Sequence, residues 1–277
     1  MRIQLRISEA CDRFPAAIQP ELRRMLPECI NSHGWFEMNI FADDPKAMEL
    51  NAFLRAHGIP HWHPRASPRS PHAYMVTRRP VYDDAELAAA RWLRLHAIQR
   101  FYPWPIDHTI DAQLTRRMLV LNPREIAPHH YDAFMEAQYS VVVHNNIKVE
   151  LEKHHFRRLV LAATRPGRFQ SEHLTQLLDW PKRGRGPWWE VTTDLQLPRP
   201  RRWDHADEYL PEGAPWDHPL DKTLHYRLSD LEPLGEFDVA TCGSNGNAPV
   251  VVSQRFYQVC KANNWRAEWV PVTIDPE

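Results

Sequence analysis

The sequence has no run of apolar residues long enough to cross a membrane, which takes about 18 to 20 residues. Its β-branched runs, such as Val141–Val143, are only three residues long, and residues 1–7 alternate between apolar and polar side chains. A secretory signal has a continuous apolar core instead. We therefore expect a soluble, cytosolic protein with no membrane partner.

Cysteine and glycine are both scarce. The four cysteines, Cys11, Cys29, Cys242 and Cys260, are widely spaced and form no C-x-x-C pair, which a zinc site built from cysteines would contain. The 9 glycines include no G-x-G-x-x-G or G-x-x-x-x-G-K-[ST] loop to cradle a phosphate. The sequence therefore predicts free thiols, no bound cofactor and no nucleotide loop.

Neither sign of charge is in excess, because 34 Lys and Arg face 35 Asp and Glu, for a net charge of −1. A general nucleic-acid binder is usually basic, so we expect no nucleic-acid partner. The apolar share of 43% and the 11 Trp also exclude a disordered, solvating chain. The 277 residues suffice for one large domain or two ordinary ones.

Residues 1–81 have the pattern of a small α/β unit. Asp44 followed by Pro45 is typical of a helix start, and Gly58 is typical of a helix end. The expected elements are strands over 3–7, 35–41 and 73–81, a helix from Pro20 and a helix from Pro45 to His57. Beyond Asp83, apolar residues recur at helical spacing through Leu87, Leu93 and Ile98, which predicts a further helix.

Two later segments resemble each other. Residues 141–164 (VVVHNNIKVELEKHHFRRLVLAAT) and 250–273 (VVVSQRFYQVCKANNWRAEWVPVT) align without a gap at an offset of 109. Three valines, Arg157 with Arg266, and Thr164 with Thr273 are identical. Each segment predicts a strand, an amphipathic helix and a second strand, with Ser253 as a helix cap. The shared pattern favours an internal duplication into two β-α-β modules.

Charge is separated between the two copies. Residues 165–202 hold eight Lys and Arg against four acids, whereas residues 203–238 hold ten acids against two bases. Aromatic residues are interleaved with these acids, a mixture that suits an interface with a basic partner. The alternative is that the basic stretch neutralises the acidic one within the fold. The predicted partner-binding residues are Trp203, Asp204, Asp207, Glu208, Tyr209, Glu212 and Trp216.

Histidine offers the strongest metal pattern. His61 and His63 lie on one face of an extended segment, with His57 nearby, and such a trio would bind zinc or nickel. The alternative is a solvated pair of loop histidines. The turn-rich sequence 242–247 contains Cys242 and Ser244, but Asn-Gly there is explained as a tight turn, so we predict no catalytic residue.

Three stretches, residues 82–95, 186–198 and 249–256 closing on 269–272, resemble bacterial polymorphic-toxin immunity proteins. That group was formerly catalogued as a domain of unknown function and is related to the double-CxxCG immunity proteins; a "VVS-R" start and a "PV" final strand recur in it. The resemblance spans roughly residues 80–277. It implies a non-enzymatic protein that binds a cognate toxin. Its double-CxxCG relatives carry two cysteine pairs for a structural metal, whereas residues 95–119 contain no cysteine.

Together these observations predict an α+β fold with a small N-terminal α/β domain over 1–81. A larger, immunity-protein-like domain over 82–277 would contain the repeat 141–164 and 250–273. The expected function is to bind and neutralise a toxin in the cytoplasm, without a cofactor or a metal. The alternative is a metal-dependent hydrolase that uses His57, His61 and His63.

Overall fold

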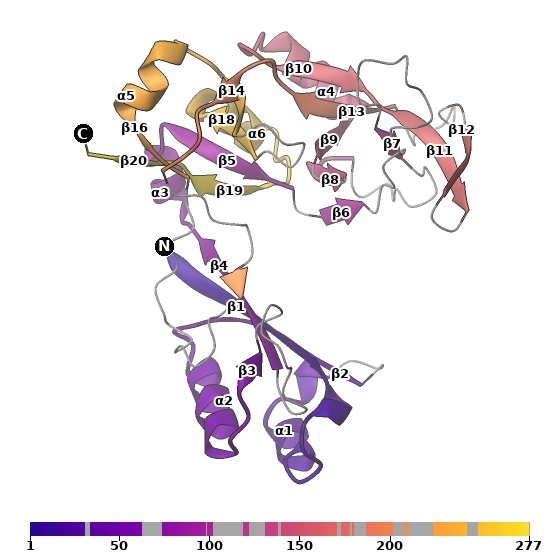
Figure 1. Cartoon of the computed structure of the whole chain (residues 1–277), viewed down its shortest axis with the longest axis vertical. Coiled ribbons are helices and arrows are strands. Elements are labelled where there is room, and N and C mark those ends of the chain that lie inside the picture. Colours follow the sequence, from indigo (N-terminus) through magenta and orange to yellow (C-terminus); the bar gives the residue numbers. More distant parts are fainter. Residues whose placement is uncertain are drawn as a thin grey trace. The chain divides into compact units, whose positions relative to one another are not determined.

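The computed structural model of the chain is shown in Figure 1. It describes residues 1–30, 34–62, 74–97, 99–101, 119–121, 131–137, 140–170, 173–177, 179, 187–201, 208–209, 224–242 and 249–276. The chain forms two compact units. Unit 1 contains Met1–Asp83 and Trp203–Lys222, and unit 2 contains Asp84–Arg202 and Thr223–Glu277. The fold is α+β, as the sequence predicts.

Residues 203–222 belong to unit 1, although the sequence predicts them within the larger domain. The reason lies in a pairing between distant strands. The strand β15 (Glu208–Tyr209) pairs antiparallel with β4 (Tyr74–Val81). The chain therefore leaves unit 2 after Arg202, adds a strand to unit 1, and returns at Thr223.

Unit 1 is a sheet with two helices. Its sheet has the order β15-β4-β1-β2, and β3 also pairs with β4. Leu5 and Ile7 of the central strand pack in one core with Leu22 and Leu50 of the helices, while the intervening residues face away from that core. The further elements of unit 1 are β1 (Arg2–Ala10), η1 (Cys11–Arg13), α1 (Gln19–Met25), η2 (Pro27–Cys29), β2 (Trp35–Phe41), α2 (Pro45–Ala56) and β3 (His61–Trp62).

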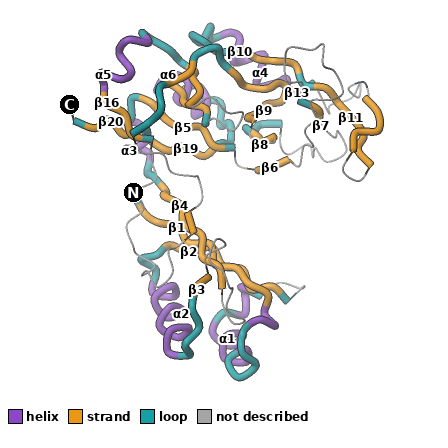
Figure 2. Tube along the Cα trace, in the orientation of Figure 1, coloured by secondary structure: helices purple, strands orange, loops and turns teal. Residues whose placement is uncertain are grey.

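The ends of α2 confirm the prediction from sequence. Asp44 is the N-cap, and its carboxylate accepts a hydrogen bond of 2.9 Å from the Lys46 backbone N–H. The helix ends at Ala56, and Gly58 follows with a φ of +66°, a conformation that glycine adopts without strain. In Figure 2, short teal loops connect α2 to β2 before it and to β3 after it.

Unit 2 contains two five-stranded sheets, which have the orders β10-β13-β9-β8-β6 and β14-β17-β18-β5-β19. Smaller sheets have the orders β12-β11-β7 and β16-β20. The elements are α3 (Asp84–Ala89), β5 (Trp92–His96), β6 (Gln99–Phe101), β7 (Val120–Leu121), β8 (Met135–Ala137), β9 (Ser140–His144), α4 (Asn145–Lys153), β10 (Val160–Ala163), β11 (Arg165–Gln170), β12 (His173–Leu177), β13 (Trp188–Thr192), β14 (Gln196–Leu197), β16 (His225–Arg227), α5 (Leu228–Leu231), η4 (Glu232–Leu234), β17 (Val239–Cys242), β18 (Val250–Ser253), α6 (Gln254–Ala262), β19 (Glu268–Pro271) and β20 (Thr273–Asp275).

The two similar segments fold alike. Each is a strand, a helix of nine residues and a second strand, namely β9-α4-β10 and β18-α6-β19. Ser253 caps α6 by accepting a hydrogen bond from the Phe256 N–H, and His144 caps α4 through its ring Nδ1. The predicted pair of related β-α-β modules is confirmed.

The gapless alignment is wrong by one residue after Arg157 and Arg266. Leu161 lies opposite Val191 in the first module, and in the second Trp269 lies opposite Leu95. Trp269 rather than Val270 is thus the counterpart of Leu161. The first module has one more residue between helix and strand, and Arg158 there has a φ of +66°.

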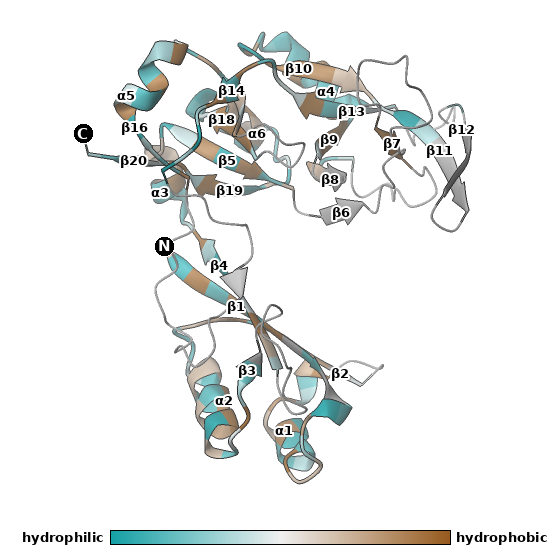
Figure 3. Ribbon diagram, viewed as in Figure 1, coloured by the Kyte–Doolittle hydropathy of each residue, from teal (hydrophilic) through white to brown (hydrophobic). Residues whose placement is uncertain are grey.

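The helix predicted beyond Asp83 is also corrected. It ends at Ala89, and Trp92–His96 form the strand β5. Figure 3 shows this strand within the sheet, with hydrophobic residues in brown among hydrophilic ones in teal. β5 pairs with β18 on one side and β19 on the other, so both of its edges are hydrogen-bonded. Pairing with these distant strands outweighs the local helical spacing of Trp92, Leu93 and Leu95.

Candidate functional site

Of the predicted partner-binding residues, Glu208 and Tyr209 lie in β15, at one edge of the sheet of unit 1. The register places Glu208 opposite Arg78 and Tyr209 opposite Thr77. Trp203, Asp204, Asp207, Glu212 and Trp216 lie outside the described residues. We call residues 203–222 the acidic insertion, because they hold six acids against a single lysine.

The rest of the acidic stretch has a different place. Asp230, Glu236 and Asp238 belong to unit 2, where they bind Arg201, Arg157 and Arg255. Tyr226 and Phe237 are buried in the core of unit 2. The predicted patch over 203–238 is therefore divided, and acids of its second part are paired with arginines of unit 2.

The described members of the histidine trio have separate surroundings. His57 is exposed at the end of α2, where its ring lies 4.7 Å from that of Phe53. His61 is buried against Tyr74, and His63 lies outside the described residues. Among the residues that the structure describes, no three His, Cys, Asp or Glu side chains are grouped so as to hold a metal ion.

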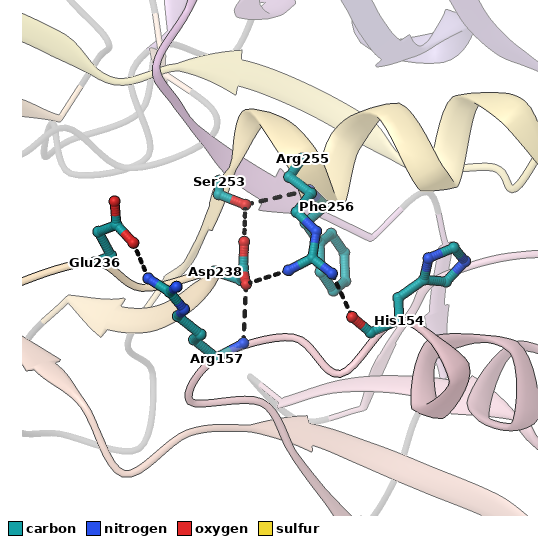
Figure 4. Close-up of polar contacts among 7 residues, drawn as sticks. All are labelled: His154, Arg157, Glu236, Asp238, Ser253, Arg255 and Phe256. Atoms are coloured by element: carbon teal, nitrogen blue, oxygen red, sulfur yellow. Dashed lines mark hydrogen bonds and ion pairs between the residues drawn. The ribbon is translucent and has the colours of Figure 1, made fainter.

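A cluster of polar contacts in unit 2 surrounds Asp238, whose side chain is buried (Figure 4). One carboxylate oxygen accepts a hydrogen bond of 2.6 Å from the Ser253 hydroxyl. The other accepts from the Arg157 backbone N–H at 2.9 Å and from the Arg255 guanidinium at 3.1 Å. Asp238 thus joins Ser253 and Arg255 of the second module to the loop that follows α4 of the first module.

The partners of Asp238 make further contacts that hold them in place. Arg255 also donates to the His154 carbonyl, and its guanidinium lies over the ring of Phe156. Ser253 accepts from the Phe256 N–H while it donates to Asp238. The serine hydroxyl therefore serves as a helix cap and a clamp, and the cluster joins the two modules.

Sequence reasoning identified Ser253 as a cap but missed Asp238. The available signal was an acid directly before the apolar residues of β17, in the sequence Glu236-Phe237-Asp238-Val239. A carboxylate at such a place is costly to bury unless donors surround it. The sequence could not supply those donors, because Arg157 comes from a distant part of the chain.

His144 is a second buried polar residue, at the end of β9. Its ring stacks on Tyr131 at 4.1 Å and meets Trp188 edge to face at 5.5 Å. Nδ1 accepts a long hydrogen bond of 3.4 Å from the Asn146 N–H. Burial lowers the pKa of His144 below its ordinary value, because water no longer solvates the charged ring.

The stability of unit 2 should therefore fall in mild acid. The unfolded chain binds a proton at His144 near pH 6.5, before the folded chain does, so stability is complete above that pH and declines as pH falls toward the folded-state pKa. We expect His144→Asn to reduce the difference in urea unfolding between pH 7.5 and pH 5.5. The exposed His57→Asn serves as the control, and an equal change in both variants would contradict the assignment.

In the part of the chain that the structure describes, no helix has the length and apolar character of a membrane span. No protein-family model, no curated protein and no solved structure matches the chain.

Proposed function

We propose that this protein binds and blocks a toxin protein without catalysis, in the cytoplasm, and that the acidic insertion is its main contact surface. The observation that carries the proposal is the division of the acidic stretch. Asp230, Glu236 and Asp238 bind arginines within unit 2, whereas the insertion is set apart as an addition to the sheet of unit 1.

The position of β15 supports a binding role. It forms one edge of the sheet, and its two residues belong to a strongly acidic, Trp-containing stretch of the sequence. Aromatic anchors bury area in an interface, and acidic groups attract a basic surface from a distance. A toxin that cleaves nucleic acid or nucleotides would present such a basic cleft. The resemblance to polymorphic-toxin immunity proteins points to the same class of partner.

The direct test uses the product of the reading frame next to the gene for this protein. We expect that product to arrest growth when it is expressed alone in a sensitive bacterium. Co-expression of this protein should restore growth, and the two purified proteins should form a stable complex. A neighbouring product that is harmless, or whose toxicity this protein does not relieve, would contradict the proposal.

A second test concerns charge. Asp204, Asp207, Glu208 and Glu212 changed together to Asn or Ser should slow association with that toxin, while thermal stability stays nearly unchanged. Since screening acts within about 10 Å at 0.1 M salt, the wild-type association rate should fall steeply with ionic strength and the variant rate should not. Stopped-flow binding at several salt concentrations measures both.

The matched control removes four exposed acids elsewhere on unit 1, namely Asp12, Glu28, Asp43 and Glu49. This control changes the net charge by the same amount but leaves the acidic insertion unchanged. Most of the association rate should therefore remain. If both variants slow association equally, net charge rather than the acidic insertion controls binding. A collapse of stability in the first variant would make the insertion a structural element.

A further inference from the structure

The two five-stranded sheets of unit 2 have the same arrangement. Written from matching ends, their orders are β10-β13-β9-β8-β6 and β19-β5-β18-β17-β14. In both sheets the first three pairs are antiparallel and the last pair is parallel. The likeness therefore extends beyond the β-α-β segments to whole sheets, and β5 takes the position of β13.

The registers agree as well. Trp188 begins β13 opposite His144, and Trp92 begins β5 opposite Ser253, the equivalent helix cap. The residue before each tryptophan accepts a hydrogen bond from the first residue of the helix. The Asn145 N–H donates to the Pro187 carbonyl at 3.1 Å, and the Gln254 N–H donates to the Arg91 carbonyl at 3.2 Å.

The order of the strands along the chain shows that the two sheets exchange a strand. One repeat runs from β5 through β6, β8 and β9 to β10, and the next runs from β13 through β14, β17 and β18 to β19. The first strand of each repeat lies in the sheet of the other. Figure 1 shows this directly, since the purple β5 lies beside the yellow β18 and β19.

The short connections require the exchange. In the first sheet, β13 and β6 run in the same direction, as the pair orientations show. If β5 occupied the place of β13, it would be parallel to β6 in one sheet, and joining parallel strands takes a dozen residues or more. Only Ala97 and Ile98 separate β5 from β6. Only residues 193–195 separate β13 from β14, so the same reasoning applies to the second repeat, and neither repeat can complete its own sheet.

We infer that unit 2 is a strand-exchanged pair of repeats. Each repeat has an open position, or slot, between two of its strands, and the first strand of the other repeat fills it. The slot lies between β9 and β10 in one sheet and between β18 and β19 in the other. Arginine ion pairs connect the exchanged halves in both directions. Arg157 of the first repeat binds Glu236 of the second, and Arg266 of the second binds Asp132 of the first.

The test is a pair of cysteine variants of the full-length chain, each with a specific protease site inserted at Gly184, between the repeats. Leu95→Cys with Val250→Cys joins residues that lie opposite each other across β5 and β18. Leu95→Cys with Val141→Cys is the matched control, because Val141 is the counterpart of Val250 in the first module. After mild oxidation and cleavage, a non-reducing gel and peptide mass mapping identify the disulfide.

We expect the first variant to keep its two pieces covalently joined and the second to form no disulfide between its introduced cysteines. A disulfide in the second variant, or none in either, would overturn the exchange. Leu93→Asp provides a second measurement by hydrogen exchange, because Leu93 is buried in β5. Amides of β18 and β19 should then lose at least tenfold in protection. If those of β9 and β10 lose it instead, the inference is wrong.

Discussion

Trp188→Ala is expected to lower the free energy of unfolding of unit 2 by about 3–5 kcal/mol, the usual cost of deleting a large buried side chain. Trp188 has 0% of its surface exposed, and it packs in one core with Leu121, Met135 and Val142. Its loss leaves a cavity at the centre of the first five-stranded sheet. Urea unfolding followed by far-UV circular dichroism measures the effect.

Trp189→Ala is the matched control. The side chain of Trp189 is only half-buried, and it lies against the Lys148 ammonium and donates to the Asn145 side chain. We expect a loss of about 1 kcal/mol, the usual value of one hydrogen bond. Equal losses in the two variants would mean that Trp188 is not the packing centre of this sheet.

Asp238→Ala should cost about 3 kcal/mol, because removing one partner of a buried polar cluster leaves the others unsatisfied. The variant would orphan the Arg157 N–H and free the guanidinium of Arg255, which now bind the carboxylate. Asp238→Asn keeps the shape and one acceptor oxygen, so it should lose less. Both values come from urea unfolding at neutral pH.

Glu236→Gln is the comparison for Asp238. Glu236 also binds an arginine of the first module, but 79% of its side chain is exposed. Exposed ion pairs contribute between zero and about 1 kcal/mol, and high salt weakens them further. A Glu236 variant as unstable as Asp238→Ala would show that the clamp acts through surface charge rather than through the buried carboxylate.

Elements fixed by neighbouring residues could be predicted from the sequence. The Asp44-Pro45 start of α2 and the β-α-β pattern of both modules depend on contacts within a few residues. β5 could not be predicted, because its apolar residues also fit a helix and its partner strands come more than 150 residues later in the sequence. The extra residue at Arg158 was hidden because the chance identity of Thr164 and Thr273 favoured a gapless alignment.

The candidate sites also differ in how far the sequence could predict them. The acidic insertion could be found by composition alone, since charge and aromatic residues are visible in sequence. Its separation from Asp230, Glu236 and Asp238 depends on where the chain crosses between units, and composition carries no information about that crossing. The buried clamp at Asp238 depends on donors from both modules, so no local pattern indicates it.

The placement of β5 also determines when unit 2 can fold during synthesis. Its residues leave the ribosome long before Val250–Ser253 and Glu268–Pro271, the strands that flank it in the finished protein. Until those later strands have been made, apolar Leu93 and Leu95 of β5 remain uncovered. Contacts between residues so far apart slow folding and expose the growing chain to aggregation. Production of this protein should accordingly depend on chaperones that shield nascent chains more strongly than its size alone would indicate.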